Sequence, residues 1–199
     1  MTSVRAAMRA QTQKELDDNT KLYLLRNRLE PKKDGEGFTQ VTFLLRHYLK
    51  VANAAHRQSL TRLILSCHPL ALERLRHTEH RRPKIPRDMR LCRFCKVHIE
   101  SPEHALLECA GNEDIMALRT EFTNKLEYEL PQWDLVKNLD PVNRLRTLIA
   151  ERDTIGLLAK FTHEVIALYE ATPVLIPSLP LDWVIARYER STSGNMIVS

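Results

Sequence analysis

The stretch Arg90-Leu91-Cys92-Arg93-Phe94-Cys95-Lys96-Val97-His98-Ile99-Glu100-Ser101-Pro102-Glu103-His104-Ala105-Leu106-Leu107-Glu108-Cys109 holds three of the four cysteines of this chain. With its second histidine the stretch reads Cys-x2-Cys-x8-His-x4-Cys. A structural Zn²⁺ takes four tetrahedral ligands from thiolate and imidazole groups, and two cysteines two residues apart can turn both sulfurs toward one ion. The spacing therefore predicts a closed zinc site formed by Cys92, Cys95, His104 and Cys109.

The second ligand pair is expected on a short helix from about 102 to 110. Ser101 is a good N-cap and Pro102 suits the first helical position, while Gly111 supplies a stop. His104 and Cys109 are five residues apart, so an ideal α-helix would separate them by roughly 140°. We therefore expect the last turn of this helix to open or tighten so that both side chains reach the metal.

Other readings of these residues stay open. His98 and Glu100 are alternative ligands from the same loop, although His98 follows Cys95 too closely to complete the site easily. The cysteines could also be buried small hydrophobes, or a disulfide with a spare thiol. Cys67 and His68, farther upstream, are interpreted as a core thiol and a helix-end histidine.

Positive charge gathers just before and within the cysteine turn. Residues 74–96 contain nine Arg or Lys residues against two acidic ones, a charge of +7 in a chain whose net charge is +5. Such a segment can neutralise the phosphates of RNA or DNA, and an outward aromatic ring can stack on an unpaired base. The candidate nucleic-acid-binding residues are Arg81, Arg82, Lys84, Arg87, Arg90, Arg93, Phe94 and Lys96.

Composition favours an all-α fold. The 199 residues include only 5 glycines, and alternating β-branched segments are rare. We predict a helical bundle with an inserted small zinc-binding turn and helix. Its parts are an N-terminal helical region (1–78), the basic approach with the zinc segment (79–112), a C-terminal helical region (113–178), and a flexible tail with a possible short helix (179–199).

The spacing of apolar residues and the positions of caps and prolines define the individual helices. Asn112, Asp140 and Asp153 are the predicted N-caps of the three helices that follow the zinc segment, and Trp133 is predicted to be in the core. Pro69 is expected to start or kink a short helix through Leu75. The other predicted helices span about 12–29, 39–57, 60–67, 112–130, 141–149 and 154–169.

Several classes of function find no support in the sequence. There is no glycine-rich phosphate loop, no nucleophile elbow and no His-Glu-x2-His, and four ligands would leave a zinc ion no open catalytic position. We therefore predict no catalytic residues. No apolar run has the length of a membrane span, and the cysteine usage favours a reducing intracellular compartment, nucleus or cytoplasm.

The cysteine motif resembles the zinc-binding domain that follows the polymerase in non-LTR retrotransposon reverse transcriptases, in its fungal form. The matching features are Cys92-x2-Cys95, the run from Glu100 to His104, and two leucines before Cys109. An upstream Leu-Thr-Arg-Leu at 60–63 also looks like the lead-in of that family. The good match covers about 59–112, with a looser match to about 177.

The resemblance implies a module that grips template RNA or target DNA beside a polymerase domain. The Tyr-x-Asp-Asp turn of reverse transcriptases is missing from this sequence, so the chain itself is not expected to be an enzyme. The sequence thus predicts a zinc-dependent nucleic-acid-binding module that contacts mainly phosphates. The alternative is a helical protein-interaction domain that zinc only staples together.

Overall fold

A computed structural model describes residues 2–26, 29–31, 38–40, 46–79 and 83–178 of the chain. Within these ranges the protein is mostly helical, which confirms the predicted fold class, with one short antiparallel ribbon. Its longer helices are α1 (Thr2–Asp18), α2 (Ala54–Ile64), α4 (Glu113–Glu129), α6 (Pro141–Ala150) and α7 (Ile155–Ala171). The shorter elements are η1 (Thr20–Leu25), η2 (His47–Lys50), α3 (Ala71–Arg74), η3 (Arg87–Met89), η4 (His104–Glu108) and α5 (Trp133–Val136).

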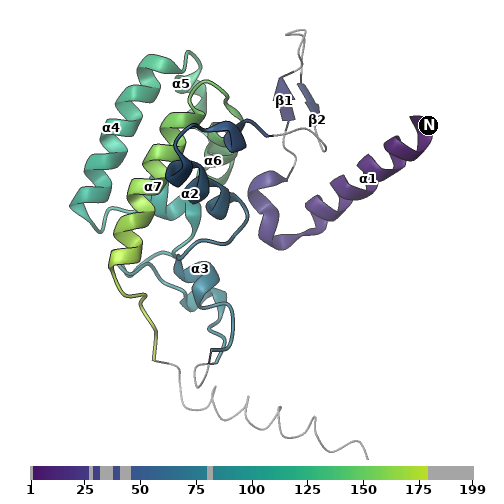
Figure 1. Ribbon diagram of the computed structural model, residues 1–199. Coiled ribbons are helices and arrows are strands. Elements are labelled where there is room, and N and C mark those ends of the chain that lie inside the picture. The colour runs from purple at the N-terminus through teal and green to yellow at the C-terminus, as the bar shows by residue number, and fades with distance from the viewer. Residues whose placement is uncertain (1, 27–28, 32–37, 41–45, 80–82, 179–199) are drawn as a thin grey trace, which may run out of the picture.

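Helix α7 is the centre of the bundle. It packs against α2, α4 and α6, and Figure 1 shows α4 and α7 side by side. Its buried side chains recur at helical spacing on a broad face, so this one helix can bury surface against several neighbours. Phe161 stacks on Phe122 of α4, with ring centroids 4.4 Å apart. The core therefore joins elements from both ends of the sequence.

The C-terminal helices follow the predictions closely. The Asn112 side chain accepts a hydrogen bond from the backbone N–H of Ile115, and Asp140 accepts one from Asn143. Trp133 is buried, as predicted. Helix α7 differs at its start, because Thr154 rather than Asp153 is its N-cap residue and no side chain caps it.

The N-terminal half differs more from the prediction. Instead of one helix over 12–29, α1 ends at Asp18, and the Asn19 side chain caps the separate turn η1. Strand β1 (Leu29–Pro31) then pairs antiparallel with β2 (Phe38–Gln40). In Figure 1, α1 extends away from the bundle, and its side chains are mostly exposed.

A second difference concerns residues 39–67, where two helices were predicted. Residues 41–45 lie outside the described residues, η2 follows them, and α2 then begins after Asn53. The Asn53 side chain accepts hydrogen bonds from the N–H groups of Ala55 and His56, which fixes the start of α2 at Ala54, five residues before Ser59. Ser59, which directly precedes the predicted helix 60–67, therefore lies inside α2. The predicted tail helix also lies outside the described residues.

Among the described helices, none combines the length and the apolar character that crossing a membrane requires.

Candidate metal centre

The first two cysteines lie in a tight turn closed by backbone hydrogen bonds. Leu91 and Ile99 form an antiparallel bridge at its base, and the N–H of Cys92 donates to the carbonyl of His98 over 2.8 Å. Lys96 has a φ of 58°, and its N–H donates to the carbonyl of Cys92 over 2.9 Å. This left-handed residue reverses the chain directly after Cys95, so both sulfurs are held on one side of the turn.

The second ligand pair flanks a single π-helical turn, η4, which begins at His104 and is followed directly by Cys109. The backbone N–H of His104 lies 3.4 Å from the Ser101 hydroxyl oxygen, as expected for a capping serine. The N–H of Cys109 donates to the carbonyl of His104 over 2.8 Å, a bond between residues five apart. This wider turn places His104 and Cys109 on the same side of the element. This confirms the expectation that the last turn must open or tighten, and the turn opens.

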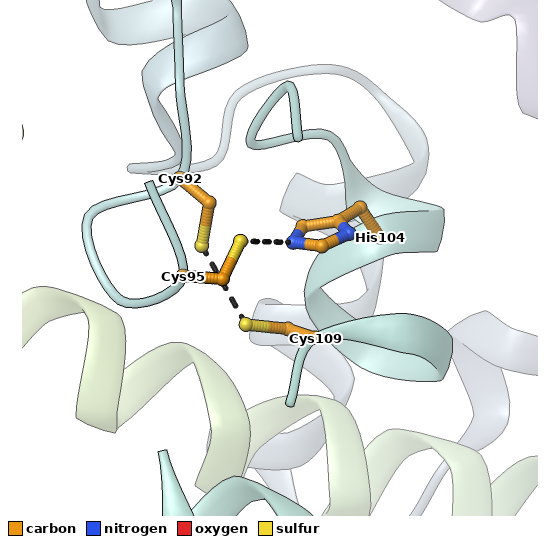
Figure 2. Close-up of side chains that lie close together, drawn as sticks. All are labelled: Cys92, Cys95, His104 and Cys109. Atoms are coloured by element: carbon orange, nitrogen blue, oxygen red, sulfur yellow. Dashed lines mark hydrogen bonds between the residues drawn. The ribbon is translucent and has the colours of Figure 1, made fainter. Parts of the chain in front are cut away.

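Figure 2 shows the three sulfurs and the imidazole converging on one point. Their ligand atoms all lie within 4.8 Å of one another. The Sγ atoms of Cys92 and Cys109 are 3.6 Å apart, and Sγ of Cys95 is 3.4 Å from Nε2 of His104. Sulfurs about 2.3 Å from a tetrahedral Zn²⁺ would lie about 3.8 Å from one another. The buried cluster therefore fits a bound metal ion such as zinc.

The pKa values of the cysteine thiols in the cluster differ from their ordinary values, and the shift at Cys109 favours metal binding. A hydrogen bond with the Cys92 thiol lowers the pKa of Cys109 and so favours its thiolate form. The same bond, together with burial, raises the pKa of Cys92. Metal ligation needs deprotonated thiols, so an ion would displace the Cys92 proton.

Two residues far along the sequence support the cluster, and the sequence analysis missed both. The hydroxyl of Tyr169, on α7, lies 3.5 Å from Sγ of Cys92. Arg119, on α4, donates to the carbonyls of Leu106 and Cys109 over 2.7 and 2.8 Å, which ties down the end of the π turn. Its positive charge also lies near the Cys109 thiolate. Neither residue stands in a recognisable motif.

Glu108 gives the imidazole a further neighbour. Its carboxylate Oε2 lies 3.9 Å from Nδ1 of His104, the ring nitrogen that faces away from Cys95. Metal-bound histidines commonly donate their second N–H to a carboxylate or carbonyl group, which fixes the orientation of the ring. Among the described residues Nδ1 has no hydrogen-bond partner, so Glu108 is the candidate for this role.

Glu100 is not a metal ligand in this structure. It is fully buried, and its Oε1 lies 2.6 Å from Nη2 of Arg93 and accepts the N–H of Ala71 over the same distance. Arg93 also donates to the carbonyls of Pro69 and Thr172. These bonds join the cysteine turn to the start of α3 and to the end of α7.

Arg90, Arg93 and Phe94, which were predicted to contact nucleic acid, make most of their contacts within the fold. Arg90 and Arg93 are only 6% and 8% exposed, because their guanidinium groups satisfy buried carbonyl and carboxylate oxygens. Phe94 packs against the core, with its ring 4.8 Å from that of Tyr169 in an edge-to-face contact. The two guanidinium groups are thus engaged within the fold, and the Phe94 side chain is half-buried against the core.

The other predicted contact residues differ in placement. Lys84, Arg87 and Lys96 are exposed, and these three keep the proposed role. Arg81 and Arg82 lie outside the described residues. The exposed part of the basic approach is therefore smaller than the count of charges suggested.

Cys67, His68 and His98 are not part of the four-residue cluster. Cys67 is exposed rather than a core thiol, whereas His68 is buried, and neither ring nitrogen of His68 has a partner among the described residues. His98 is exposed, and its ring centroid lies 5.2 Å from that of His104. No disulfide joins any of the four cysteines, which is consistent with a reducing environment.

Comparison with known proteins adds no family to this description: no protein-family model matches the chain, and neither the curated proteins nor the solved structures give a match.

Proposed function

We propose that this chain is a zinc-stapled helical module that binds single-stranded nucleic acid through phosphate contacts. The observation that carries the proposal is that exposed cations lie on the same segment that holds the buried Cys-Cys-His-Cys cluster. Lys84 and Arg87 precede the first ligand, and Lys96 lies in the turn between ligands. A metal-held turn presents such cations at little entropic cost, because the backbone is already ordered.

The role of the metal in this proposal is structural. Cys92, Cys95, His104 and Cys109 would fill a tetrahedral sphere and leave no open position for a substrate. When bound, the ion supplies a cross-link between the cysteine turn and the π turn. The residues of the chain then do the binding, and no catalytic step is assigned to them.

The ligand spacing resembles that of the zinc domain of non-LTR reverse transcriptases, and this resemblance also supports nucleic-acid binding. In that setting the chain would act beside a polymerase domain and hold RNA or DNA near it. The alternative, a protein-interaction domain, gains from the burial of Arg90 and Arg93, since these charges serve the fold. A binding experiment separates the two.

The test measures the affinity of the zinc-loaded protein for a mixed-sequence single-stranded RNA by fluorescence anisotropy at several salt concentrations. Phosphate contacts predict a linear fall of log affinity with log salt, with a slope of about −0.7 per contact for single strands. Replacing Lys84→Ala together with Lys96→Ala should weaken binding. The slope of log affinity against log salt should become shallower by the amount that corresponds to about one to two lost phosphate contacts. The matched control is Arg5→Ala with Arg9→Ala on the exposed helix α1, which removes the same charge elsewhere.

If the control variant loses as much affinity as the Lys84 and Lys96 variant, binding is a diffuse charge effect and the proposed surface is wrong. Absence of RNA binding at low salt would favour the protein-interaction alternative. Single-stranded DNA of the same sequence, measured in parallel, reports which nucleic acid is preferred.

A further inference from the structure

A second feature, separate from the metal centre, is a pocket of about 490 Å³ between η1, α3, η3 and α6. Its volume is in the range of small-molecule sites. Leu72 and Val142 give it some apolar lining, and Tyr23 contributes an aromatic side chain. The remaining lining is dominated by arginine side chains: Arg26, Arg76, Arg87, Arg90 and Arg146.

The charge of this arginine pocket is strongly positive. Only two acidic residues, Glu73 and Glu103, belong to its described lining, so the five guanidinium groups leave a balance of +3. Arginine is always protonated, and its planar fork of donors matches phosphate and carboxylate oxygens. A site with this balance favours an anion.

Both glutamates already have partners on the pocket wall. Glu73 accepts a hydrogen bond from Nη1 of Arg76 over 3.2 Å. Glu103 accepts one from the Tyr23 hydroxyl over 2.6 Å. Burial and the neighbouring Glu103 raise the pKa of Tyr23, so the phenol keeps its proton and donates to this carboxylate. The acidic groups are therefore partly neutralised before any ligand enters.

The arginines fall into two groups: those whose guanidinium groups donate to backbone carbonyls of the protein, and those with N–H donors that can reach a ligand. Arg90 donates to the carbonyls of Leu72 and Ile85, and Arg146 donates to the carbonyl of Tyr23. By contrast, Nε of Arg26 is buried without a hydrogen-bond partner among the described residues. Arg87 is exposed, and Glu73 is the side-chain hydrogen-bond partner of Arg76 within the described part of the chain. An unsatisfied buried donor costs free energy that a bound acceptor would recover.

We infer that this arginine pocket binds a phosphate monoester, with Arg26, Arg76 and Arg87 as the groups that contact the phosphate. A phosphate monoester carries about −1.5 to −2 charge at neutral pH and offers three acceptor oxygens. It therefore matches the balance of +3 better than a carboxylate, which carries one charge. The volume leaves room for a nucleoside attached to the phosphate. This inference does not depend on the proposed nucleic-acid function, because a free mononucleotide would satisfy the pocket as well as the phosphorylated end of a strand.

The probe is a matched pair, adenosine 5′-monophosphate and adenosine, titrated into the zinc-loaded full chain by calorimetry with no RNA present. The phosphorylated member should bind at least about tenfold more tightly, since charge-assisted hydrogen bonds are among the strongest polar contacts. The variant Arg26→Gln with Arg76→Gln should lose most of that difference. The control Arg5→Gln with Arg9→Gln makes the same change of charge on α1 and should retain it.

A third variant distinguishes a contact role from a merely structural one. Glu73→Gln removes a negative charge from the pocket wall and releases Arg76, so it should bind the monophosphate several-fold more tightly than the parent. A loss of binding in this variant would overturn the assignment. Equal affinity for the two probes, or an equal loss in the α1 control, would also overturn it.

The source of the phosphate is decided by a second pair, a ten-nucleotide RNA with either a 5′-phosphate or a 5′-hydroxyl. The parent protein is compared with the variant Arg26→Gln with Arg76→Gln: if the parent prefers the 5′-phosphorylated RNA and the variant has no such preference, the pocket is assigned to strand ends. Preference confined to the mononucleotide assigns it to a free compound. Either result supports a phosphate site. Because Lys84 and Lys96 lie outside the described lining, failure of the RNA surface and failure of this pocket can be told apart.

Discussion

Glu100 and Arg93 form a buried ion pair with 2.6 Å between Oε1 and Nη2, and both side chains are almost completely shielded from solvent. They are seven positions apart in the sequence, with Arg93 in the cysteine turn and Glu100 two residues before the helical segment that carries His104. The N–H of Arg93 also donates to Oε2 of Glu100 over 2.7 Å. The two halves of the metal centre are thus joined by charge as well as by the ligands.

Replacing Arg93→Met should destabilise the protein strongly, because it leaves the Glu100 carboxylate buried without its countercharge. We expect a loss of about 3–5 kcal/mol in the free energy of unfolding, measured by urea denaturation. The control is Arg62→Met, which breaks a half-exposed pair with Glu170 and should change the free energy by no more than about 1 kcal/mol. Comparable losses in the two variants would mean that the buried pair has no special role.

Gly111 should tolerate no side chain. A Cβ atom there would lie 2.4 Å from the backbone nitrogen of Cys95 and 2.6 Å from the carbonyl carbon of Phe94. Gly111→Ala must therefore push the cysteine turn away from the π turn. We expect a cost of about 1–3 kcal/mol and a weaker metal affinity, measured by competition with a chelator.

Gly156, on α7, provides the matched control. A Cβ atom there meets nothing within 4 Å, so Gly156→Ala should stabilise the helix by about 0.5–1 kcal/mol. Its metal affinity should equal that of the parent. If Gly111→Ala behaves in the same way, the close approach of the two turns is incorrect.

Loss of the metal should be local in its consequences. Cys109→Ser is expected to abolish binding of one zinc ion, seen by native mass spectrometry, and to increase proteolysis within 90–112. The helices around α7 should persist in circular dichroism, because most of their core, including the stacked rings of Phe122 and Phe161, consists of hydrophobic side chains other than the metal ligands. Cys67→Ser, which changes the exposed cysteine, should leave metal content and proteolysis unchanged.

His68 should make the protein sensitive to mild acid. Burial lowers its pKa to about 4, whereas an unfolded histidine titrates near 6.5. Below pH 6.5 the unfolded chain binds a proton that the folded protein excludes, so stability falls as pH falls, until the folded pKa is passed. From pH 7 to pH 5 the loss attributable to this group is about 2 kcal/mol.

The comparison variant for this prediction is His68→Leu, since neither ring nitrogen has a partner among the described residues. Acid protonation of the metal ligands affects both proteins equally, so the difference between their unfolding free energies isolates His68. If the parent and the variant lose the same free energy between pH 7 and pH 5, His68 is not held neutral by the fold.

Short-range features of the chain could be read from the sequence because their physics is local. The spacing of Cys92 and Cys95 dictates a tight turn, and Asn112 and Asp140 cap helices through their own neighbours. A departure from ideal helix geometry between His104 and Cys109 also followed from arithmetic, since these two residues cannot share a face of an ideal helix, and the structure shows that the turn opens. Helical composition and periodicity were sufficient for the fold class.

Which of the basic residues are buried and which are exposed was decided only by tertiary structure. In the sequence Arg87, Arg90, Arg93 and Lys96 look equivalent, yet two are buried and two are exposed. The difference arises because the carbonyls of Leu72, Ile85 and Pro69 and the Glu100 carboxylate need donors where those chain segments meet.

The sequence alone thus determined which side chains can hold a metal ion and where most C-terminal helices begin. Only folding decided which charges face solvent, which distant residues, such as Arg119 and Tyr169, support the cluster, and that five arginines line one pocket. The physical reason is that ligand spacing and capping act over a few residues. Burial and charge compensation depend instead on segments that meet only in three dimensions.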